Sequence, residues 1–373
     1  MKRKCKNVDI TNIEFIKTAI ARCLKKKKET RKDIVDLRER YPNLDTLAYE
    51  IQAEIQSRSI TLYPLRMREK IDTSSGKLRV IGMQNIRNQI YDYIAVMALE
   101  ELSRRLGRYQ CASVKGRGQI YGLKAIRKWM KNPKETRYML KLDIKKFYPS
   151  VKHETIMSFL HKRVKNDPLL WLIGEILKSF GETGLSIGSY LSQTLANLLL
   201  SDLYHFIEGR TAAKTRRGVT RFKRLCSHVL FYMDDLLNFG AIKSYLKKLA
   251  KEIQIQLGRM GLTFKFKPAI VKIVGRKIFV DMLGFKIYRR KASIRKRNWK
   301  RARRSLLRFD RKPWNIDLAR RLVSYWGFIK HTDSREIRKT YKAGGLKRKA
   351  SKLIAKFARG EHYGKNHHNI AFA

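Results

Sequence analysis

Apolar residues recur at helical spacing near the start of the chain. One stripe comprises Ile13, Ile16, Ile20 and Leu24. A second stripe lies within residues 44–55. Because residues three and four apart share a helix face, each stripe predicts an amphipathic helix with one buried side. Between them, KKKKETRK (25–32) predicts a loop or a surface that faces phosphate. We expect residues 1–60 to form an N-terminal helical extension.

The next region, residues 61–136, begins with strand-like residues and continues with helical ones. The segment from Leu62 to Met83 predicts two short strands, because turn residues at 74–76 divide it. A long helix is predicted from Ile90 to about Leu106.

The central region, residues 137–288, mixes strands and helices. RYMLKLDIKKFYPSV (137–151) predicts a buried strand that ends at Asp143 and is broken at Pro149. CSHVLFYMDDLLNF (226–239) predicts a hairpin, because two apolar arms flank a polar centre. The other predicted elements are a glycine-bearing turn at 186–193, a helix ending at 159, helices at 194–206 and 241–258, and strands at 262–266 and 277–288.

Beyond Tyr288 the composition becomes strongly basic. Residues 289–304 contain ten Lys and Arg in sixteen positions and no acid. Further on, one helical face is predicted from Leu318, Leu322, Tyr325 and Ile329. We therefore expect residues 289–373 to form a separate basic helical domain.

Net charge identifies the class of partner. The chain has 85 Lys+Arg against 31 Asp+Glu, a formal charge of +54. Self-repulsion on that scale opposes compaction unless a polyanion is bound, so nucleic acid is the expected partner. The charge does not distinguish an enzyme from a structural RNA-binding protein.

The cysteine pattern and hydropathy bear on location. The four cysteines include no CxxC pair, so neither a disulfide framework nor a zinc site is predicted, which fits a reducing cytoplasm. LLWLIGEIL is too short to cross a bilayer. We expect a cytoplasmic protein without a membrane partner.

Three aspartates carry the candidate chemistry. Asp143 ends a predicted strand, and Asp234 and Asp235 occupy the tip of the predicted hairpin. Adjacent carboxylates in apolar surroundings repel, and hard divalent cations such as Mg²⁺ remove that cost. Two such ions can activate a 3′-hydroxyl and stabilise leaving pyrophosphate. Because side chains alternate along a strand, Asp234 is the expected direct ligand beside Asp143. The alternative is an ordinary solvent-exposed turn.

These residues occur within a wider resemblance. Residues 137–151, 184–200, 231–239 and 281–288 resemble the successive palm motifs of reverse transcriptases, and Tyr232-Met233-Asp234-Asp235 matches their YxDD box. The resemblance implies an α+β right-hand polymerase. Its parts are expected as fingers at 61–136, a palm with an antiparallel sheet at 137–288 (part of the fingers interleaved), and a thumb with a C-terminal tail at 289–373.

The resemblance assigns roles residue by residue. Two Mg²⁺ ions, with Mn²⁺ as a substitute, are expected on Asp143, Ile144, Asp234 and Asp235. Tyr148 stands where the family keeps a steric gate against ribonucleotides. The expected nucleotide-binding set is Lys77, Arg79, Tyr148, Ile187, Gly188 and Gln193. The expected nucleic-acid-binding set is Tyr232, Met233, Leu283, Gly284, Arg295, Lys296, Arg297, Lys300 and Arg301. Lys265 or Lys267 is a candidate proton donor to pyrophosphate.

One departure from the family pattern narrows the resemblance. Many reverse transcriptases carry QGxxxSP where this chain has IGSYLSQ (187–193). The pattern IGxxxSQ resembles the diversity-generating-retroelement and related defence-associated bacterial lineages. Ile187 removes an amide donor beside the nascent base pair, so we expect low fidelity or unusual template choice.

The expected activity is RNA-templated DNA synthesis. Its partners would be an RNA template, in particular a structured non-coding RNA, with dNTPs, the cDNA product, and an accessory protein or further copies of the chain. No RNase H domain or zinc endonuclease is expected in this sequence. Antiviral defence and diversity generation both remain open as roles. A non-catalytic, maturase-like RNA chaperone is the alternative.

Overall fold

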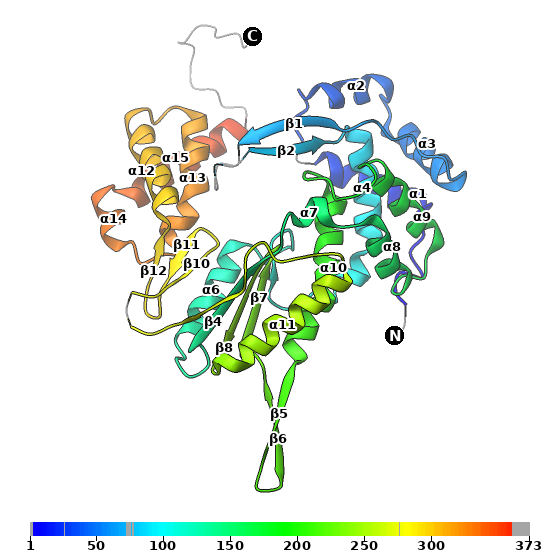
Figure 1. Cartoon of the computed structure of the whole chain (residues 1–373). Helices are drawn as coiled ribbons and strands as arrows, with labels where there is room; N and C mark the ends of the chain where they lie inside the picture. The colour runs from blue at the N-terminus through cyan, green and yellow to red at the C-terminus, as the bar shows by residue number, and fades with distance from the viewer. Residues whose placement is uncertain (1–2, 26, 72–75, 77, 276, 360–373) are drawn as a thin grey trace. The chain divides into compact units, whose positions relative to one another are not determined.

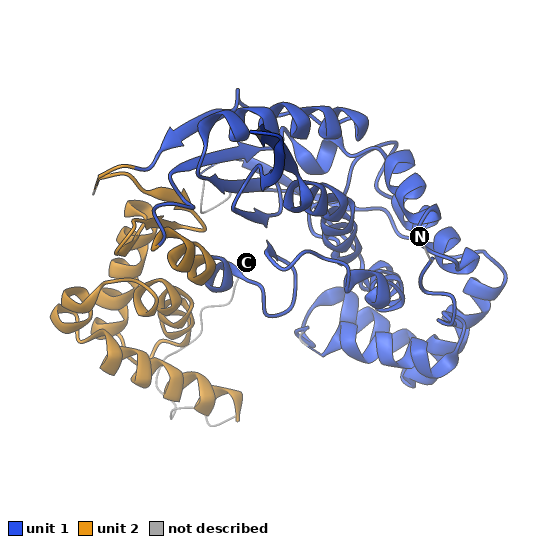
Figure 2. Cartoon of the chain, turned by 90° about the horizontal axis from the view of Figure 1, so that it is seen from below, with its two compact units in different colours: residues 1–122, 132–273 blue, residues 123–131, 274–373 orange. Residues whose placement is uncertain are grey.

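The computed structural model describes residues 3–25, 27–71, 76, 78–275 and 277–359. Lys77 lies outside these residues. The chain folds into two compact units (Figure 2). Unit 1 comprises residues 1–122 and 132–273, and unit 2 comprises residues 123–131 and 274–373. No helix in the described part of the chain is long and apolar enough to span a bilayer.

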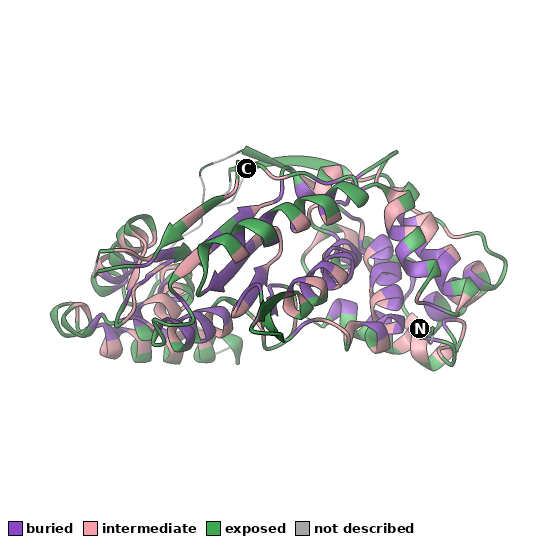
Figure 3. Cartoon of the chain, turned by 60° about the horizontal axis from the view of Figure 1, so that its bottom comes forward, coloured by how far each residue is buried: buried purple, intermediate pink, exposed green. Residues whose placement is uncertain are grey.

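The predicted N-terminal helices are confirmed. Helices α1 (Ile13–Leu24) and α3 (Leu44–Gln56) carry the two predicted stripes, and α2 (Lys32–Arg40) is an additional helix between them in the sequence. Helices α1 and α2 contact α4 (Ile86–Ala98), and α3 contacts α1 (Figure 1). Their apolar stripes are buried and their opposite faces exposed (Figure 3). Asn12 and Asn43 accept hydrogen bonds from the first turns of α1 and α3, which fixes where these helices begin.

The predicted strand pair is found, and the predicted long helix both begins and ends earlier than expected. Strands β1 (Arg66–Ile71) and β2 (Leu78–Met83) form an exposed antiparallel ladder. Helix α4 begins four residues earlier than predicted, because Asn85 caps it, and ends at Ala98. A separate short helix, α5 (Glu100–Ser103), follows.

A five-stranded sheet forms the centre of unit 1, in the order β3-β7-β8-β4-β9. Its strands are β3 (Gln110–Cys111), β4 (Tyr138–Asp143), β7 (His228–Tyr232), β8 (Asp235–Gly240) and β9 (Ala269–Lys272). Only the β3–β7 pairing is parallel. Helices α10 (Tyr190–Gly209) and α11 (Lys243–Arg259) contact each other and the sheet. The sheet and helices confirm the predicted α+β class.

Four further helices belong to this part of the chain. They are α6 (Gln119–Met130), which continues into the residues of unit 2, α7 (Phe147–Ser150), α8 (His153–His161) and α9 (Asp167–Lys178).

Two local expectations differ from the structure, and one further element was not expected. The predicted strand at 262–266 is reduced to one bridge, Phe264 to Ile144, because this segment crosses the end of β4 before β9 pairs beside it. Helix α10 begins at Tyr190, where Ser189 caps it. A two-stranded hairpin, β5 (Thr211–Arg216) and β6 (Val219–Arg224), was not predicted.

Unit 2 consists of a small sheet and a helical group with its own core. The sheet contains β10 (Val280–Met282), β11 (Phe285–Ile287) and β12 (Ala292–Ile294). The helices are α12 (Lys296–Arg311), α13 (Ile316–Lys330), α14 (Arg335–Thr340) and α15 (Ala343–Ala358). Leu306, Phe309, Leu322 and Ile329 are buried between them, so the predicted apolar face is confirmed in part. The subdomain boundaries drawn from the sequence stay predictions.

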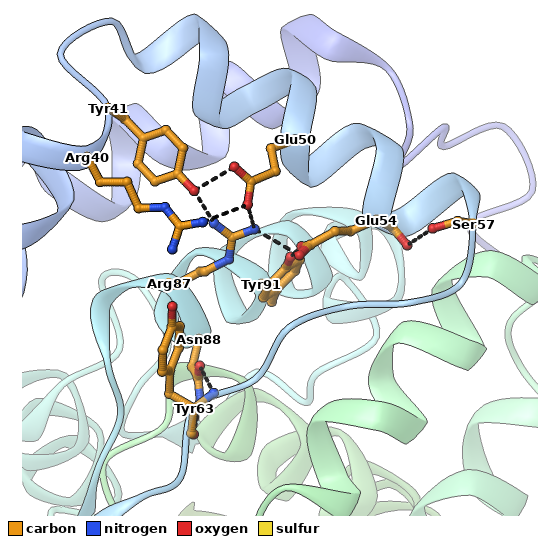
Figure 4. Close-up of polar contacts among 9 residues, drawn as sticks. All are labelled: Arg40, Tyr41, Glu50, Glu54, Ser57, Tyr63, Arg87, Asn88 and Tyr91. Carbon is orange, nitrogen blue, oxygen red and sulfur yellow. Dashed lines mark hydrogen bonds and ion pairs between the residues drawn. The ribbon is translucent and has the colours of Figure 1, made fainter.

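Arg87 links the N-terminal helices to α4 through a buried ion cluster (Figure 4). Its guanidinium lies 2.7 Å from Glu50 Oε1 and 2.9 Å from Glu54 Oε1. It also donates to Tyr41 at 2.9 Å, while Tyr91 donates to Glu54. A buried charge is tolerated only when it is paired in this way.

Replacing Arg87 with Met is expected to destabilise the protein by about 3–5 kcal/mol, because both glutamates lose their buried counter-charge. Urea unfolding measures the change. Arg38→Met is the control, since Arg38 is exposed and only loosely paired with Glu29 at 3.6 Å; a cost below about 0.5 kcal/mol is expected there. Equal costs for the two variants would contradict a structural role for the cluster.

Candidate active site

The strand register brings two of the three aspartates face to face. Asp143 is the last residue of β4 and lies opposite Asp235, the first residue of β8. Cross-strand partners project to the same face of a sheet. Leu140 and Leu142 are buried on the other face, so alternation along β4 leaves Lys141 and Asp143 on the open face.

The turn between β7 and β8 carries Asp234. Tyr232 and Asp235 pair across it, with Met233 in the left-handed region at φ 53°. A non-glycine residue with positive φ is strained, and such strain is found at functional sites. The Ile144 N–H donates to the Asp234 carbonyl at 3.2 Å, and the Lys265 N–H donates to the Asp143 carbonyl at 2.8 Å. These backbone bonds hold the turn and the end of β4 together.

The aspartates act on one another electrostatically. Burial, then repulsion from Asp235 and Asp143, raises the pKa of Asp234 to about 6, and the charge of Arg79 opposes this shift. Burial also raises the pKa of Asp235, with Asp143 adding to the effect and Lys141 opposing it. The like charges of these neighbouring carboxylates repel, so each raises the energy of the other's charged form.

Two lysines lie against this charge. Lys265 Nζ is 2.9 Å from Asp143 Oδ2, and Lys141 Nζ is 3.6 Å from Asp235 Oδ1. Lys265 thus contacts a predicted metal ligand, whereas Lys267 has no such contact among the described residues.

The three carboxylates fit a divalent cation by their donor chemistry. They are hard oxygen donors, partly buried and mutually repulsive, which is the setting that Mg²⁺ or Mn²⁺ stabilises. Among the described residues no three Asp, Glu, His or Cys side chains already stand in joint ligating positions. Binding would therefore require the carboxylates to turn away from Lys141 and Lys265. The register sets Asp235 opposite Asp143, so which of Asp234 and Asp235 ligates directly stays a prediction.

The predicted nucleotide-binding residues that the structure describes all lie in unit 1. Burial raises the pKa of Tyr148, and the charge of Asp234 adds to the shift. Arg79, on β2, acts on the same carboxylate. Ile187 is half-buried and Gln193 lies in the first turn of α10.

Gly188 is required where the loop before α10 meets β2. Its φ is +128°, and a Cβ there would lie 2.8 Å from the Gly82 carbonyl oxygen. Only glycine combines this backbone conformation with so close an approach. The predicted contact of this loop with a nucleotide stays a prediction.

Asp92 is a residue that the sequence did not single out. It is fully buried on α4 and accepts hydrogen bonds from Ser189 Oγ at 2.7 Å and from the Tyr190 and Leu191 N–H groups. Burial raises its pKa to about 6, and the Ser189 and Gln84 hydrogen bonds oppose the shift. Asp92 therefore anchors the start of α10 beside the site. In the sequence, a single acidic residue within the apolar pattern of α4 was the feature that could have identified Asp92.

The predicted nucleic-acid-binding residues divide between the two units. Tyr232 and Met233 belong to unit 1, where Tyr232 hydrogen-bonds Gln119. The remainder belong to unit 2. There Leu283 and Gly284 form the β10–β11 turn, and a Cβ on Gly284 would meet Asn298 at 2.6 Å. On or beside α12, Lys296, Arg297 and Lys300 are exposed, Arg301 is half-buried, and Arg295 pairs with Asp281 at 2.7 Å.

Comparisons with known proteins match a family model to more than half of the chain. Residues 69–287 match the family described as Reverse transcriptase (RNA-dependent DNA polymerase). A Schizosaccharomyces pombe protein, "Uncharacterized 91 kDa protein in cob intron", is 25% identical over 223 residues, which span 57% of this chain and 27% of that protein. Apo telomerase from Candida tropicalis, truncated from the C-terminal domain, aligns with a TM-score of 0.43 at 12% identity, over 67% of this chain and 60% of that chain.

Asp234→Asn is expected to stabilise the protein at pH 8 without divalent cations by about 1–3 kcal/mol. The pKa of Asp234, about 6, lies above its unfolded value, so its protonation favours folding at low pH and this contribution is lost as the pH rises through 6. Thermal unfolding at several pH values measures both effects. Asp36→Asn, at an exposed site on α2, is the control for net charge. A variant no more stable than the parent would show that the carboxylates do not repel.

Proposed function

The chain belongs to the reverse transcriptase family, and from this premise we propose that it is an RNA-directed DNA polymerase that copies RNA into cDNA by metal-assisted nucleotidyl transfer. The α+β right-hand polymerase fold expected from the sequence is confirmed by the central sheet and by the family match. The chain spans about a quarter of the curated relative that it matches, so its activity and substrates are proposals.

The observation that supports the proposal most is the charge at the open face of the sheet. Asp143, Asp234 and Asp235 repel one another there, in a chain of +54 net charge. A protein that only bound RNA would gain nothing from carboxylates facing a polyanion. Their electrostatic cost is explained when they hold cations for catalysis.

Each residue has a separate task in the proposed reaction. Asp143, Asp234 and Asp235 would hold Mg²⁺, or Mn²⁺ in its place, with the Ile144 carbonyl as a further ligand. When bound, the ions supply activation of the 3′-hydroxyl and neutralise charge on the phosphates. Arg79 neutralises the triphosphate from β2. Lys265, whose Nζ lies 2.9 Å from Asp143 Oδ2, would donate a proton to the departing pyrophosphate.

Asp143→Asn and Asp234→Asn are each expected to lower primer extension on an RNA template by on the order of 10³-fold, because charge stabilisation is lost. RNA affinity should stay within about twofold or rise slightly, since a like charge is removed. Extension assays and filter binding measure the two effects, with Asp36→Asn as the control. Variants that lose extension but keep biological function would favour the chaperone alternative, and variants that keep extension would contradict the catalytic role of the aspartates.

Tyr148 is proposed to select deoxynucleotides by excluding a 2′-hydroxyl. Tyr148→Val is expected to raise ribonucleotide incorporation relative to deoxynucleotide by on the order of 10²-fold, because the ring no longer fills the space beside the sugar. Tyr148→Phe keeps the ring and should keep the preference. Competition between the two nucleotides in single-turnover assays measures the ratio. An unchanged ratio in the Val variant would make Tyr148 a packing residue of the core.

The biological role is proposed from the sequence pattern at 187–193. IGSYLSQ supports membership of the diversity-generating-retroelement or defence-associated lineages, with a structured non-coding RNA as the proposed template. A cytoplasmic location is proposed from the cysteine pattern, which includes no CxxC pair. An accessory protein or self-association belongs to the same proposal. Sequencing the RNA and cDNA that copurify with the protein separates the roles: a repeat matching a variable gene indicates diversity generation, and a dedicated structured RNA indicates defence.

A further inference from the structure

The hairpin of β5 and β6 projects from unit 1 and is not used by the proposed active site (Figure 1). Both strands form a two-stranded sheet of their own, and every residue of β6 is exposed. A two-stranded hairpin alone is marginally stable in water, so this one has little packing to maintain it.

The hairpin is basic throughout. Residues 211–224 contain six Lys and Arg and no acid. Register places Lys214 directly opposite Arg221, and Lys223 lies on the same face two positions along β6. None of these three side chains has an acidic partner among the residues that the structure describes. Like charges directly opposite each other destabilise a strand pair, so the fold alone does not explain them.

The turn adds a further basic residue at a conformational cost. Arg217 and Gly218 both have positive φ, 50° and 74°, as a two-residue type I′ turn requires. Asn or Asp is the residue preferred where Arg217 stands, because a longer side chain is strained in that region. The opposite face of the hairpin carries Phe222, 72% exposed, beside a hydrogen bond between Thr215 and Thr220.

Protection of the open edges explains only part of this pattern. Lys and Arg on edge strands prevent pairing with other chains. That role needs neither opposed cations nor a strained Arg at the tip. An exposed Phe222 would also favour association with other chains and so oppose such protection. Charge complementarity instead indicates a polyanion as occupant.

The position of the hairpin indicates which polyanion. It joins the C-terminal end of α10 to the start of β7, whereas the aspartates follow the other end of β7. Strand β7 has five residues and strand β5 has six. At about 3.3 Å per residue, these lengths place the tip of the hairpin on the order of 30 Å from the aspartates. Nucleic acid there is not the growing end. The RNA template is present at full length before synthesis begins, whereas the DNA product is not.

We propose that the β5–β6 hairpin is an RNA-binding arm that holds the phosphate backbone of RNA at the end of the palm sheet remote from the aspartates. Lys214, Arg221 and Lys223 contact phosphates from one face, and Arg217 does so from the tip. Phosphate contacts position the RNA without reading its sequence. This inference rests on the proposed function for the choice of RNA.

The test compares two doubly substituted proteins of equal charge. Lys214→Gln with Arg221→Gln removes the opposed pair, and Lys247→Gln with Lys251→Gln removes two exposed cations from α11. The probe is an RNA duplex of about 20 base pairs, longer than the roughly 16 spanned by a double-stranded-RNA-binding module, and a DNA duplex of the same sequence. Affinity is measured between about 50 and 200 mM salt.

The hairpin variant is expected to bind the RNA duplex on the order of tenfold more weakly, and its salt slope should be smaller by about 2. The α11 variant should lose less RNA affinity than the hairpin variant. The hairpin variant should also lose less affinity for the DNA duplex than for the RNA duplex. Its melting temperature should not fall, because a like-charge pair is removed. Arg217→Asn, which suits the turn, should lose part of the affinity without loss of fold.

Three results would overturn the proposal. If the hairpin variant keeps the RNA affinity and salt slope of the unmodified protein, RNA is excluded as the ligand of the hairpin. An acidic protein would then be the candidate partner. Equal losses in both double variants would mean that only bulk charge matters. Equal losses on RNA and DNA would remove the choice of RNA. Failure of the proposed function is seen separately, as absent primer extension by the unmodified protein on a short RNA template that does not reach the hairpin.

Discussion

Repulsion among Asp143, Asp234 and Asp235 is the constraint on which the rest of the structure depends. The β4–β8 register sets Asp143 against Asp235, and the strained turn at Met233 adds Asp234. Such an arrangement raises pKa values and opposes folding unless cations compensate. The surrounding sheet, with Leu140 and Leu142 buried beneath, supplies the rigidity that keeps the three groups together.

Positive charge is organised around this negative site. Lys141 and Lys265 lie against the carboxylates, and Arg79 acts on Asp234 from β2. Cations are also exposed on the β5–β6 hairpin of unit 1 and, within unit 2, on α12. A polyanionic substrate would thus be attracted over a wide surface, while catalysis requires divalent cations at one place.

The sequence predicted those parts of the fold whose pattern is local. The alternation in β4 and the apolar arms of β7 and β8 located all three aspartates, because strand period and turn position are set by neighbouring residues. Asp92 was missed because its partners, Ser189 and the first N–H groups of α10, are distant in the sequence. The β5–β6 hairpin was missed because both of its faces are exposed and so carry no burial period. The strand at 262–266 was wrong because pairing beside β4, not composition, decides which segment becomes β9.

Anomalous diffraction from crystals soaked in Mn²⁺ tests the shared-cation account most directly, because it locates each ion without relying on turnover. The account predicts anomalous density between Asp143 and the Asp234–Asp235 turn, with Lys141 and Lys265 displaced from the carboxylates. Density elsewhere, or none with both lysine–aspartate pairs retained at saturating Mn²⁺, would contradict it.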